Sequence, residues 1–302
     1  MSPSARPHLI IGAYAALPTA SGEQEEFYSG LAALRPGNVG LEIPFRDGLG
    51  VDAGRFAAML AGRLTGSVIT LIPGTMMRLA HDPSFGLASP DADGRAAAVA
   101  YVREALDTAN DLNQRTGERS VARLHLHSAP SITADADALA RSLGELGTTG
   151  GTNDVELVVE HCDAYHPEIA GEKRFLALAA ELPIAREAGI RMTVNWGRSA
   201  VEAHSADRPA EHIATLAAAG LLAGVMFSGA GPSDNRFGGP WADAHLPLAA
   251  DEPTSLLDAA AVTRCVTLAG AGVAYLGAKI QAPGDASVAR RLDMIRHITD
   301  LL

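Results

Sequence analysis

Short apolar segments alternate along the chain with stretches that carry helical signals, and this alternation restricts the fold more than any other feature. Most of the segments are rich in Val, Ile or Leu, as is typical of strands buried on both faces of a sheet. They are His8–Tyr14, Val39–Phe45, Ser67–Ile72, Val121–Ser128, Asp154–Cys162, Ile190–Trp196, Leu222–Ser228 and Gly272–Ile280. Strands that alternate with helices pair in parallel through right-handed crossovers.

The stretches between the strands show where helices begin and end. Ser21 is an N-cap candidate that precedes acidic residues, and the stretch 91–114 is rich in alanine. A further helix is predicted to begin at Pro253 and to end at Gly270. Residues 286–302 predict an amphipathic terminal helix.

Eight strand–helix units in 302 residues predict an α/β protein with one (β/α)8 barrel, or TIM barrel, that extends over residues 1–302 as a single domain. The competing architecture is an open doubly wound sheet, but its usual G-x-G-x-x-G motif does not follow the first strand. In a barrel of parallel strands the active site lies at the carboxyl ends of the strands. Polar residues at those ends are therefore the candidate functional residues.

Composition restricts the partners and the compartment. The formal net charge of −11 argues against a nucleic-acid-binding protein, because such proteins carry a basic surface. No apolar run is long enough to span a membrane, and the first residues lack the apolar core of a secretory signal. The two cysteines form neither a metal motif nor a disulfide framework. We expect a cytoplasmic protein with a small-molecule substrate, and a homo-oligomer is left open.

The predicted strand ends carry many ionisable or polar side chains where apolar or turn residues are expected. His125 and His127 are two residues apart and therefore face the same side of their strand, although a hydrogen-bonded pair in the core is an alternative. Glu160 ends an apolar run, where a carboxylate is costly unless it is paired or ligated. A salt bridge to Arg198 or Lys279 would satisfy it. His161 and Asp163 are equally compatible with the helix layer outside the barrel. The other polar residues near these ends are Glu42, Asn195 and Ser228.

Two basic residues stand out among these side chains. Arg198 follows Asn195 and Trp196 after the sixth strand, and arginine is suited to bind a carboxylate or phosphate through two hydrogen bonds. Lys279 interrupts the eighth apolar run, and we expect it to contact Glu160 or a ligand because an unpaired buried ammonium group is unfavourable.

The long segment after the seventh strand, residues 229–253, is rich in Gly and Pro and contains Trp241, Asp243 and His245. Loops of this length inside a barrel often bind ligands or close over them, although a simple solvated loop is the alternative.

The strand-end residues resemble those of the xylose isomerase-like TIM-barrel superfamily, which includes sugar phosphate isomerases and epimerases, hydroxypyruvate isomerase, inosose-processing enzymes and endonuclease IV. The matching pieces are His127 in LHLHSAP, Glu160 in ELVVEHCD, and Asp243 with His245 in WADAHL. The resemblance implies that a histidine at the first place can bind metal. It also implies that the fifth-strand glutamate is a metal ligand or an acid/base group.

The chain departs from the superfamily at the remaining ligand positions. The sixth-strand Asp-x-x-His is replaced by Asn195-x-x-Arg198, the seventh-strand His by Ser228, and the eighth-strand Glu by Lys279. Divalent metals need oxygen or nitrogen donors with a net negative charge. We therefore predict no metal ligands and no cofactor, and Arg198 and Lys279 would take the metal's electrostatic place.

These observations predict an enzyme that acts on a small carbohydrate or polyhydroxy acid by abstracting a proton next to a carbonyl, with isomerisation, epimerisation or elimination as the result. The catalytic candidates are Glu160 as base, His127 and His245 as further acid/base groups, and Lys279 as a stabiliser of enediolate charge. The predicted substrate contacts are Glu42, His125, Asn195, Trp196, Arg198 and Asp243.

Several alternatives stay open. Lys279 could form a Schiff base with a carbonyl substrate. A divalent metal could bind at a non-standard site formed by His127, Glu160 and His245. The chain could also be a metal-dependent phosphodiesterase like endonuclease IV, or a sugar-binding barrel without turnover.

Overall fold

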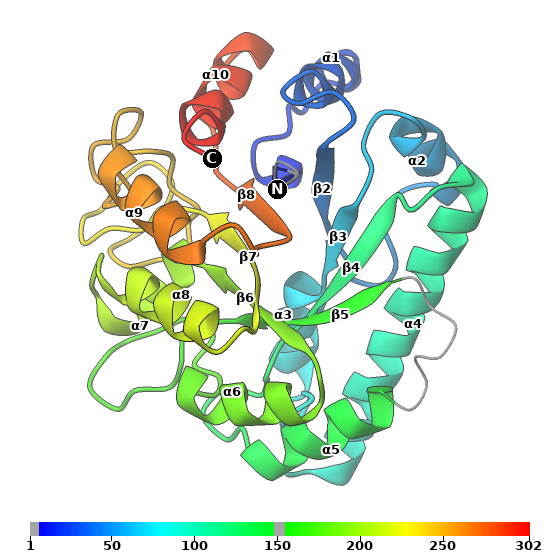
Figure 1. The fold of residues 1–302 in the computed structure, drawn as a ribbon, viewed down its shortest axis with the longest axis vertical. Helices are drawn as coiled ribbons and strands as arrows, with labels where there is room; N and C mark the ends of the chain where they lie inside the picture. The colour runs from blue at the N-terminus through cyan, green and yellow to red at the C-terminus, as the bar shows by residue number, and fades with distance from the viewer. Residues whose placement is uncertain (1–5, 148–154) are drawn as a thin grey trace.

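The computed structural model describes residues 6–147 and 155–302, in which eight parallel strands close into a barrel (Figure 1). Each strand pairs with the next one along the chain, and the last pairs with the first. The strands are β1 (His8–Ile11), β2 (Val39–Pro44), β3 (Ser67–Thr70), β4 (Val121–Leu126), β5 (Glu156–His161), β6 (Arg191–Asn195), β7 (Leu222–Phe227) and β8 (Tyr275–Ala278).

The predicted TIM barrel is confirmed, and every predicted strand is present in shorter form. The predicted strands extend too far at their carboxyl ends, because residues such as His127 and Lys279 follow the last paired positions of β4 and β8. Asp154, the predicted first residue of the fifth strand, lies outside the described residues.

Helices surround the barrel (Figure 1). They are α1 (Ser21–Ala32), α2 (Ala53–Leu60), α3 (Ile72–His81), α4 (Ala92–Thr116), α5 (Ala136–Gly147), α6 (Leu178–Glu187), α7 (Trp196–Ala203), α8 (Arg208–Ala218), α9 (Ala259–Ala269) and α10 (Val288–Thr299). A short 3-10 helix, Ala13–Ala15, follows β1. None of the helices in the described part of the chain is both long and apolar enough to cross a membrane.

Three helix starts differ from the prediction. Ala20 is the N-cap of α1, so that Ser21 is its first residue. Helix α9 begins after Asp258 rather than at Pro253, because the Asp258 side chain accepts a hydrogen bond from the backbone N–H of Ala261 and so satisfies a free donor of the first turn. Ser287 caps α10 in the same way.

Strand alternation separates two apolar layers. The outward side chains of the strands join the helices in the main hydrophobic core. The inward ones form a smaller cluster inside the barrel, which contains Ile10, Val68, Val158, Ala223, Met226 and Tyr275. In the strand register Glu42 is opposite Val68 and His125 is opposite Val158, which places both polar residues on the inner face. The fold therefore directs the polar strand-end side chains toward the carboxyl mouth of the barrel.

Candidate active site

The side chains of Glu42 and Lys279 form a buried ion pair at this mouth. The Lys279 Nζ donates to Glu42 Oε1 over 2.8 Å, and the Tyr14 hydroxyl donates to the same oxygen over 3.2 Å. Burial alone would lower the pKa of Lys279, but the charge of Glu42 outweighs it and holds the pKa above its ordinary value. Lys279 therefore carries its positive charge at neutral pH. The second oxygen of Glu42, Oε2, has no hydrogen-bond partner among the described residues.

Gly12 makes room for this pair. It lies between β1 and the 3-10 helix that carries Tyr14, and the stem of Lys279 passes directly over it. An added Cβ at Gly12 would lie only 2.6 Å from Lys279 Cγ, which is too close for any side chain. A residue without a side chain is thus required where the lysine enters the mouth.

Glu160 is held by a second group of side chains at the end of β5. Its Oε2 is 2.8 Å from His127 Nε2 and 2.8 Å from Nη1 of Arg198, whereas its Oε1 has no partner among the described residues. Burial opposes ionisation of the carboxyl, but the charge of Arg198 and the hydrogen bond from His127 hold its pKa well below the ordinary value. Glu160 is thus an ionised carboxylate with one free oxygen.

Of the two salt-bridge partners predicted for Glu160, Arg198 is confirmed, whereas Lys279 is wrong because its ammonium group pairs with Glu42. Arg198 lies in the first turn of α7, which follows β6, the strand next to β5. Its guanidinium is therefore close enough to pair with Glu160. Lys279 directly follows β8, which is three strands away from β5, and its side chain reaches across β1 to Glu42 on β2.

The loop after β7 contributes Asp243 and His245 to the mouth. Arg198 Nε donates to Asp243 Oδ2 over 3.0 Å, and Lys173 Nζ is 3.2 Å from the same oxygen. His245 Nδ1 lies 3.2 Å from Asp243 Oδ1 and 2.9 Å from Ser228 Oγ. Burial lowers the pKa of His245 despite the carboxylate beside it. The predicted binding loop therefore lies over the strand ends, with the His245 side chain only 15% exposed.

Asn195 and Trp196 begin the connection from β6 into α7. The side-chain oxygen of Asn195 accepts a hydrogen bond from the backbone N–H of Arg198 and caps α7, so it fixes the helix turn from which the guanidinium extends. The ring of Trp196 is fully buried in the main hydrophobic core. The Trp196 ring therefore anchors the first turn of α7 in the hydrophobic core.

The two histidines of β4 lie at different depths. His125 is fully buried inside the barrel, where its Nε2 is 2.7 Å from the hydroxyl of Tyr275. Burial lowers the pKa of His125 to about 4, so that the imidazole is neutral. His127 lies two residues further toward the mouth, and burial lowers its pKa as well. Because an ionised carboxylate only accepts hydrogen bonds, His127 donates to Glu160 through Nε2 and keeps a lone pair on Nδ1.

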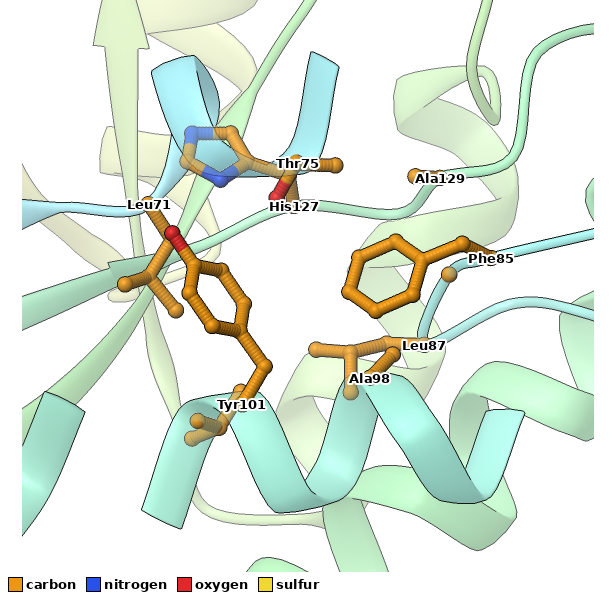
Figure 2. A pocket seen from close by; sticks show the side chains of 10 residues that line it. Leu71, Thr75, Phe85, Leu87, Ala98, Tyr101, His127 and Ala129 are labelled. Carbon is orange, nitrogen blue, oxygen red and sulfur yellow. The ribbon is translucent and has the colours of Figure 1, made fainter. Parts of the chain in front are cut away.

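His127 also lines a small pocket beside the mouth, shown in Figure 2 together with the rings of Phe85 and Tyr101 and the side chain of Thr75. The cavity volume is about 10 Å³, which is enough for about one water molecule and far less than a sugar needs. The free Nδ1 of His127 has no protein partner among the described residues. The pocket is therefore too small to be the substrate site.

Sequence reasoning missed two residues of the site. Tyr14 lies just beyond β1, at the same mouth as the other strand ends, and that position was the signal that could have found it. Lys173 lies in the segment between β5 and α6, and no local pattern marks it as a partner of Asp243.

The residues at the mouth do not fit a divalent metal. Ligand-type atoms of His127, Glu160 and Cys162 lie within 4.8 Å of one another. However, the guanidinium of Arg198 occupies the position that a metal ion would take. Its Nη1 is 2.8 Å from the Glu160 carboxylate and 3.6 Å from the Cys162 sulfur. The carboxylates of Glu42, Glu160 and Asp243 are each paired with Lys279, Arg198 or Lys173, although Lys173 is shared with Glu172. A divalent ion would therefore have to displace a fixed cation.

A family model described as "Domain of unknown function (DUF4862)" matches residues 10–294. A protein of Salmonella typhimurium, called "Uncharacterized protein STM3670", is 32% identical over 298 residues, which cover 95% of this chain and 94% of that protein.

Several solved structures share the fold. A xylose isomerase domain containing protein from Salmonella typhimurium superposes with a TM-score of 0.58 at 14% identity and covers 98% of this chain and 97% of its own. A D-tagatose 3-epimerase-like protein gives 0.62 at 12% identity, over 98% and 97%. An AP endonuclease of family 2 from Brucella melitensis gives 0.61 at 14% identity, over 94% and 96%. The fold is that of the xylose isomerase-like TIM barrels, in agreement with the resemblance in the sequence.

Proposed function

The chain belongs to the family described as "Domain of unknown function (DUF4862)", a description that names no activity, and we propose that it is an enzyme that isomerises or epimerises a small carbohydrate or polyhydroxy acid. The reaction begins with removal of a proton from the carbon next to a carbonyl group. The D-tagatose 3-epimerase-like neighbour supports a carbohydrate substrate by its fold and its name only.

The observation that carries the proposal is the state of two carboxylates. Glu42 and Glu160 are both buried at the barrel mouth, and each has one oxygen neutralised by a fixed cation and the other without a protein partner. A purely structural ion pair is expected to satisfy both oxygens, because an unpaired buried polar atom is costly. Glu160 Oε1 and Glu42 Oε2 are therefore the two oxygens that can exchange a proton with a substrate.

The proposed chemistry uses the residues as they lie. Glu160 Oε1 takes the proton from carbon, and the electron pair moves onto the carbonyl oxygen to give an enediolate. Lys279, with one N–H directed to Glu42, has further N–H donors that neutralise the developing oxygen charge. Glu160 then returns the proton to the neighbouring carbon while the proton of the substrate hydroxyl moves to the former carbonyl oxygen, which isomerises the substrate. Alternatively, Glu42 first takes a proton from water and delivers it to the opposite face of the same carbon, which epimerises the substrate, and Glu160 releases its proton to water.

The low pKa of Glu160 has a consequence for this mechanism. The carboxylate is fully ionised at neutral pH, but Arg198 makes it a weak base. The enediolate must therefore be strongly stabilised, and the mouth provides preorganised cations that water does not reach freely. A neutral His127, hydrogen-bonded to the other oxygen, holds the carboxylate in orientation.

Substrate entry requires the covering loop to move. The mouth side chains are buried beneath Asp243 and His245, which are tied to Arg198 and Ser228. Loops that open for the substrate and then close exclude water from a charged intermediate.

The test is solvent deuterium exchange, which detects proton abstraction without knowledge of the product. Sugars, sugar phosphates and sugar acids are incubated with the enzyme in D2O, and NMR measures deuterium at the carbon next to the carbonyl. We expect exchange with at least one compound, reduced at least about a hundredfold by Glu160→Gln. Glu156→Gln is the matched control, because Glu156 lies on the same strand at the opposite end of the barrel.

Three outcomes would overturn the proposal. Exchange unaffected by Glu160→Gln would remove the base. Ligand-induced stabilisation without any exchange would indicate a binding barrel. Cleavage of abasic DNA that is lost in Glu160→Gln would indicate a phosphodiesterase related to the endonuclease neighbours.

A further inference from the structure

A second group of titratable side chains lies outside the barrel, between β5 and the helices that cover it. His161 is the last residue of β5 and points away from the barrel interior, Glu181 is on α6, Glu202 is on α7 and His212 is on α8. These helices lie next to one another along one side of the molecule (Figure 1). The group is separate from the mouth and has no role in the proposed reaction.

The imidazoles of His161 and His212 both turn an Nε2 atom toward the carboxylate of Glu202. His161 Nε2 is 3.0 Å from Glu202 Oε2, and His212 Nε2 is 3.4 Å from Glu202 Oε1. One nitrogen of each ring and one carboxylate oxygen all lie within 4.8 Å of one another. The ligand atoms of a tetrahedral zinc ion, at metal–ligand distances of about 2.0–2.1 Å, are about 3.3–3.4 Å apart. The observed separations are therefore close to those of a metal site.

The other nitrogen of each ring has a partner that fixes its orientation. His161 Nδ1 is 2.7 Å from Glu181 Oε2, and the other oxygen of Glu181 accepts a hydrogen bond from the hydroxyl of Ser128. His212 Nδ1 is 3.0 Å from Ser199 Oγ. Metal-binding histidines almost always donate their second N–H to a carboxylate, carbonyl or hydroxyl partner in this way. Without a metal, both Nε2 atoms face the Glu202 carboxylate. Burial would lower the pKa of His161, but Glu181 and Glu202 raise it to about 10, so a metal ion would bind by displacing a proton from Nε2.

Charge and access also fit a divalent cation. Protonated His161 balances one of the two charges of Glu181 and Glu202, and no Lys or Arg side chain is paired with either carboxylate among the described residues. A divalent cation that displaces this proton would balance both charges. This differs from the mouth, where Arg198 takes the cation's place. The Glu202 side chain is 15% exposed and that of His212 is 7% exposed, so the group opens to the surface on one side.

We propose that His161, Glu202 and His212 bind one divalent transition metal ion of the zinc class. His161 and His212 coordinate through Nε2 and Glu202 through a carboxylate oxygen. Water takes the fourth position, because the described residues provide only three ligands. The ion would join β5, α7 and α8, and Glu181 and Ser199 would act as positioning residues for the two imidazoles.

The experiment is a cobalt titration of the full chain after treatment with a chelator. Tetrahedral Co²⁺ absorbs visible light, and Zn²⁺ should displace it. We expect one equivalent of Co²⁺ to bind, with affinity weakened at least about a hundredfold by His212→Gln or Glu202→Gln. His127→Gln, at the barrel mouth, is the matched control and should bind as the wild type does. Melting temperatures without metal check that each variant folds.

Ser199→Ala keeps the test decisive if the ligand variants do not fold. Loss of a partner that orients a metal-binding histidine weakens metal affinity about ten- to a hundredfold. Co²⁺ binding that is not stoichiometric in the wild type would overturn the proposal. Co²⁺ binding that survives His212→Gln, or that survives Ser199→Ala unchanged, would also overturn it. If that binding is lost in His127→Gln, the metal binds at the mouth instead.

Discussion

Lys279 directly follows β8 and Glu42 lies on β2, and their side chains meet at 2.8 Å with no exposed surface on either. The pair joins the strands on both sides of β1 at the carboxyl mouth. Two isolated charges at this depth would each cost several kcal/mol, so each depends on the other.

Lys279→Met is expected to destabilise the fold by about 3–5 kcal/mol, because Glu42 would keep a buried charge without a partner. Urea denaturation measures the change. Removing both charges with Lys279→Met and Glu42→Gln should restore most of the loss. Arg63→Met is the control, since its partner Glu25 is exposed and such pairs contribute at most about 1 kcal/mol. A Lys279→Met protein as stable as the wild type would show that Glu42 finds another way to be neutralised.

The loop over the mouth provides a second prediction. Asp243 receives Arg198, Lys173 and His245, so Asp243→Asn removes the charge that fastens this loop to the barrel. We expect backbone amides in residues 243–246 to exchange with deuterium at least about tenfold faster, as measured by mass spectrometry. Asp234→Asn is the matched control, because Asp234 is an exposed aspartate in the same loop. Unchanged exchange in Asp243→Asn would mean that the apolar contacts of the loop, and not its charges, hold it.

The fold was predictable because its signals are local. Each strand is a short β-branched or leucine-rich run buried on both faces, and such runs need no knowledge of their neighbours. The strand ends were less predictable, since the side chains of His127 and Lys279 continue the pattern after pairing has stopped. The start of α9 was missed because Asp258, which lies beyond the predicted start at Pro253, provides the stronger cap.

The site was predictable as a set of residues and not as a set of contacts. Alternation along β5 placed Glu160 inside the barrel and made the helix layer one of two positions open to His161. Which cation meets Glu160 depends on the order of strands around the barrel, and that order favours Arg198. The partners of His161 are on three different helices, and no spacing in the sequence links them.

Acid stability is expected to depend on His125. In the fold its pKa is about 4, lowered by burial and opposed by Glu160 and Glu42, whereas an unfolded histidine titrates near 6.5. Between these values the unfolded chain binds one more proton than the folded one. The free energy of unfolding should therefore fall as pH decreases from about 6.5 to 4, by on the order of 3 kcal/mol for this group.

His125→Gln should reduce that slope by about one proton, because glutamine does not titrate and can still hydrogen-bond to Tyr275. Urea denaturation at several pH values measures it. His166→Gln, at an exposed position, is the control and should leave the slope as it is. Equal slopes for His125→Gln and the wild type would show that the acid dependence comes from the other groups at the mouth.

The barrel interior provides the last prediction. Gly224 on β7 faces the ring of Tyr275, and an added Cβ would lie 2.3 Å from ring carbon atoms. The ring cannot move aside freely, because its hydroxyl is 2.7 Å from His125 Nε2 and the guanidinium of Arg123 is 5.0 Å from its centroid. Gly224→Ala should therefore cost about 1–3 kcal/mol through overpacking, as measured by urea denaturation. Gly144→Ala is the matched control: it lies on the exposed face of α5 with open space around it and should stabilise the helix by up to about 1 kcal/mol. If Gly224→Ala is as stable as the wild type, the barrel interior has more room around Tyr275 than these contacts allow. Packing against Tyr275 would then not fix the position of His125 relative to Glu160.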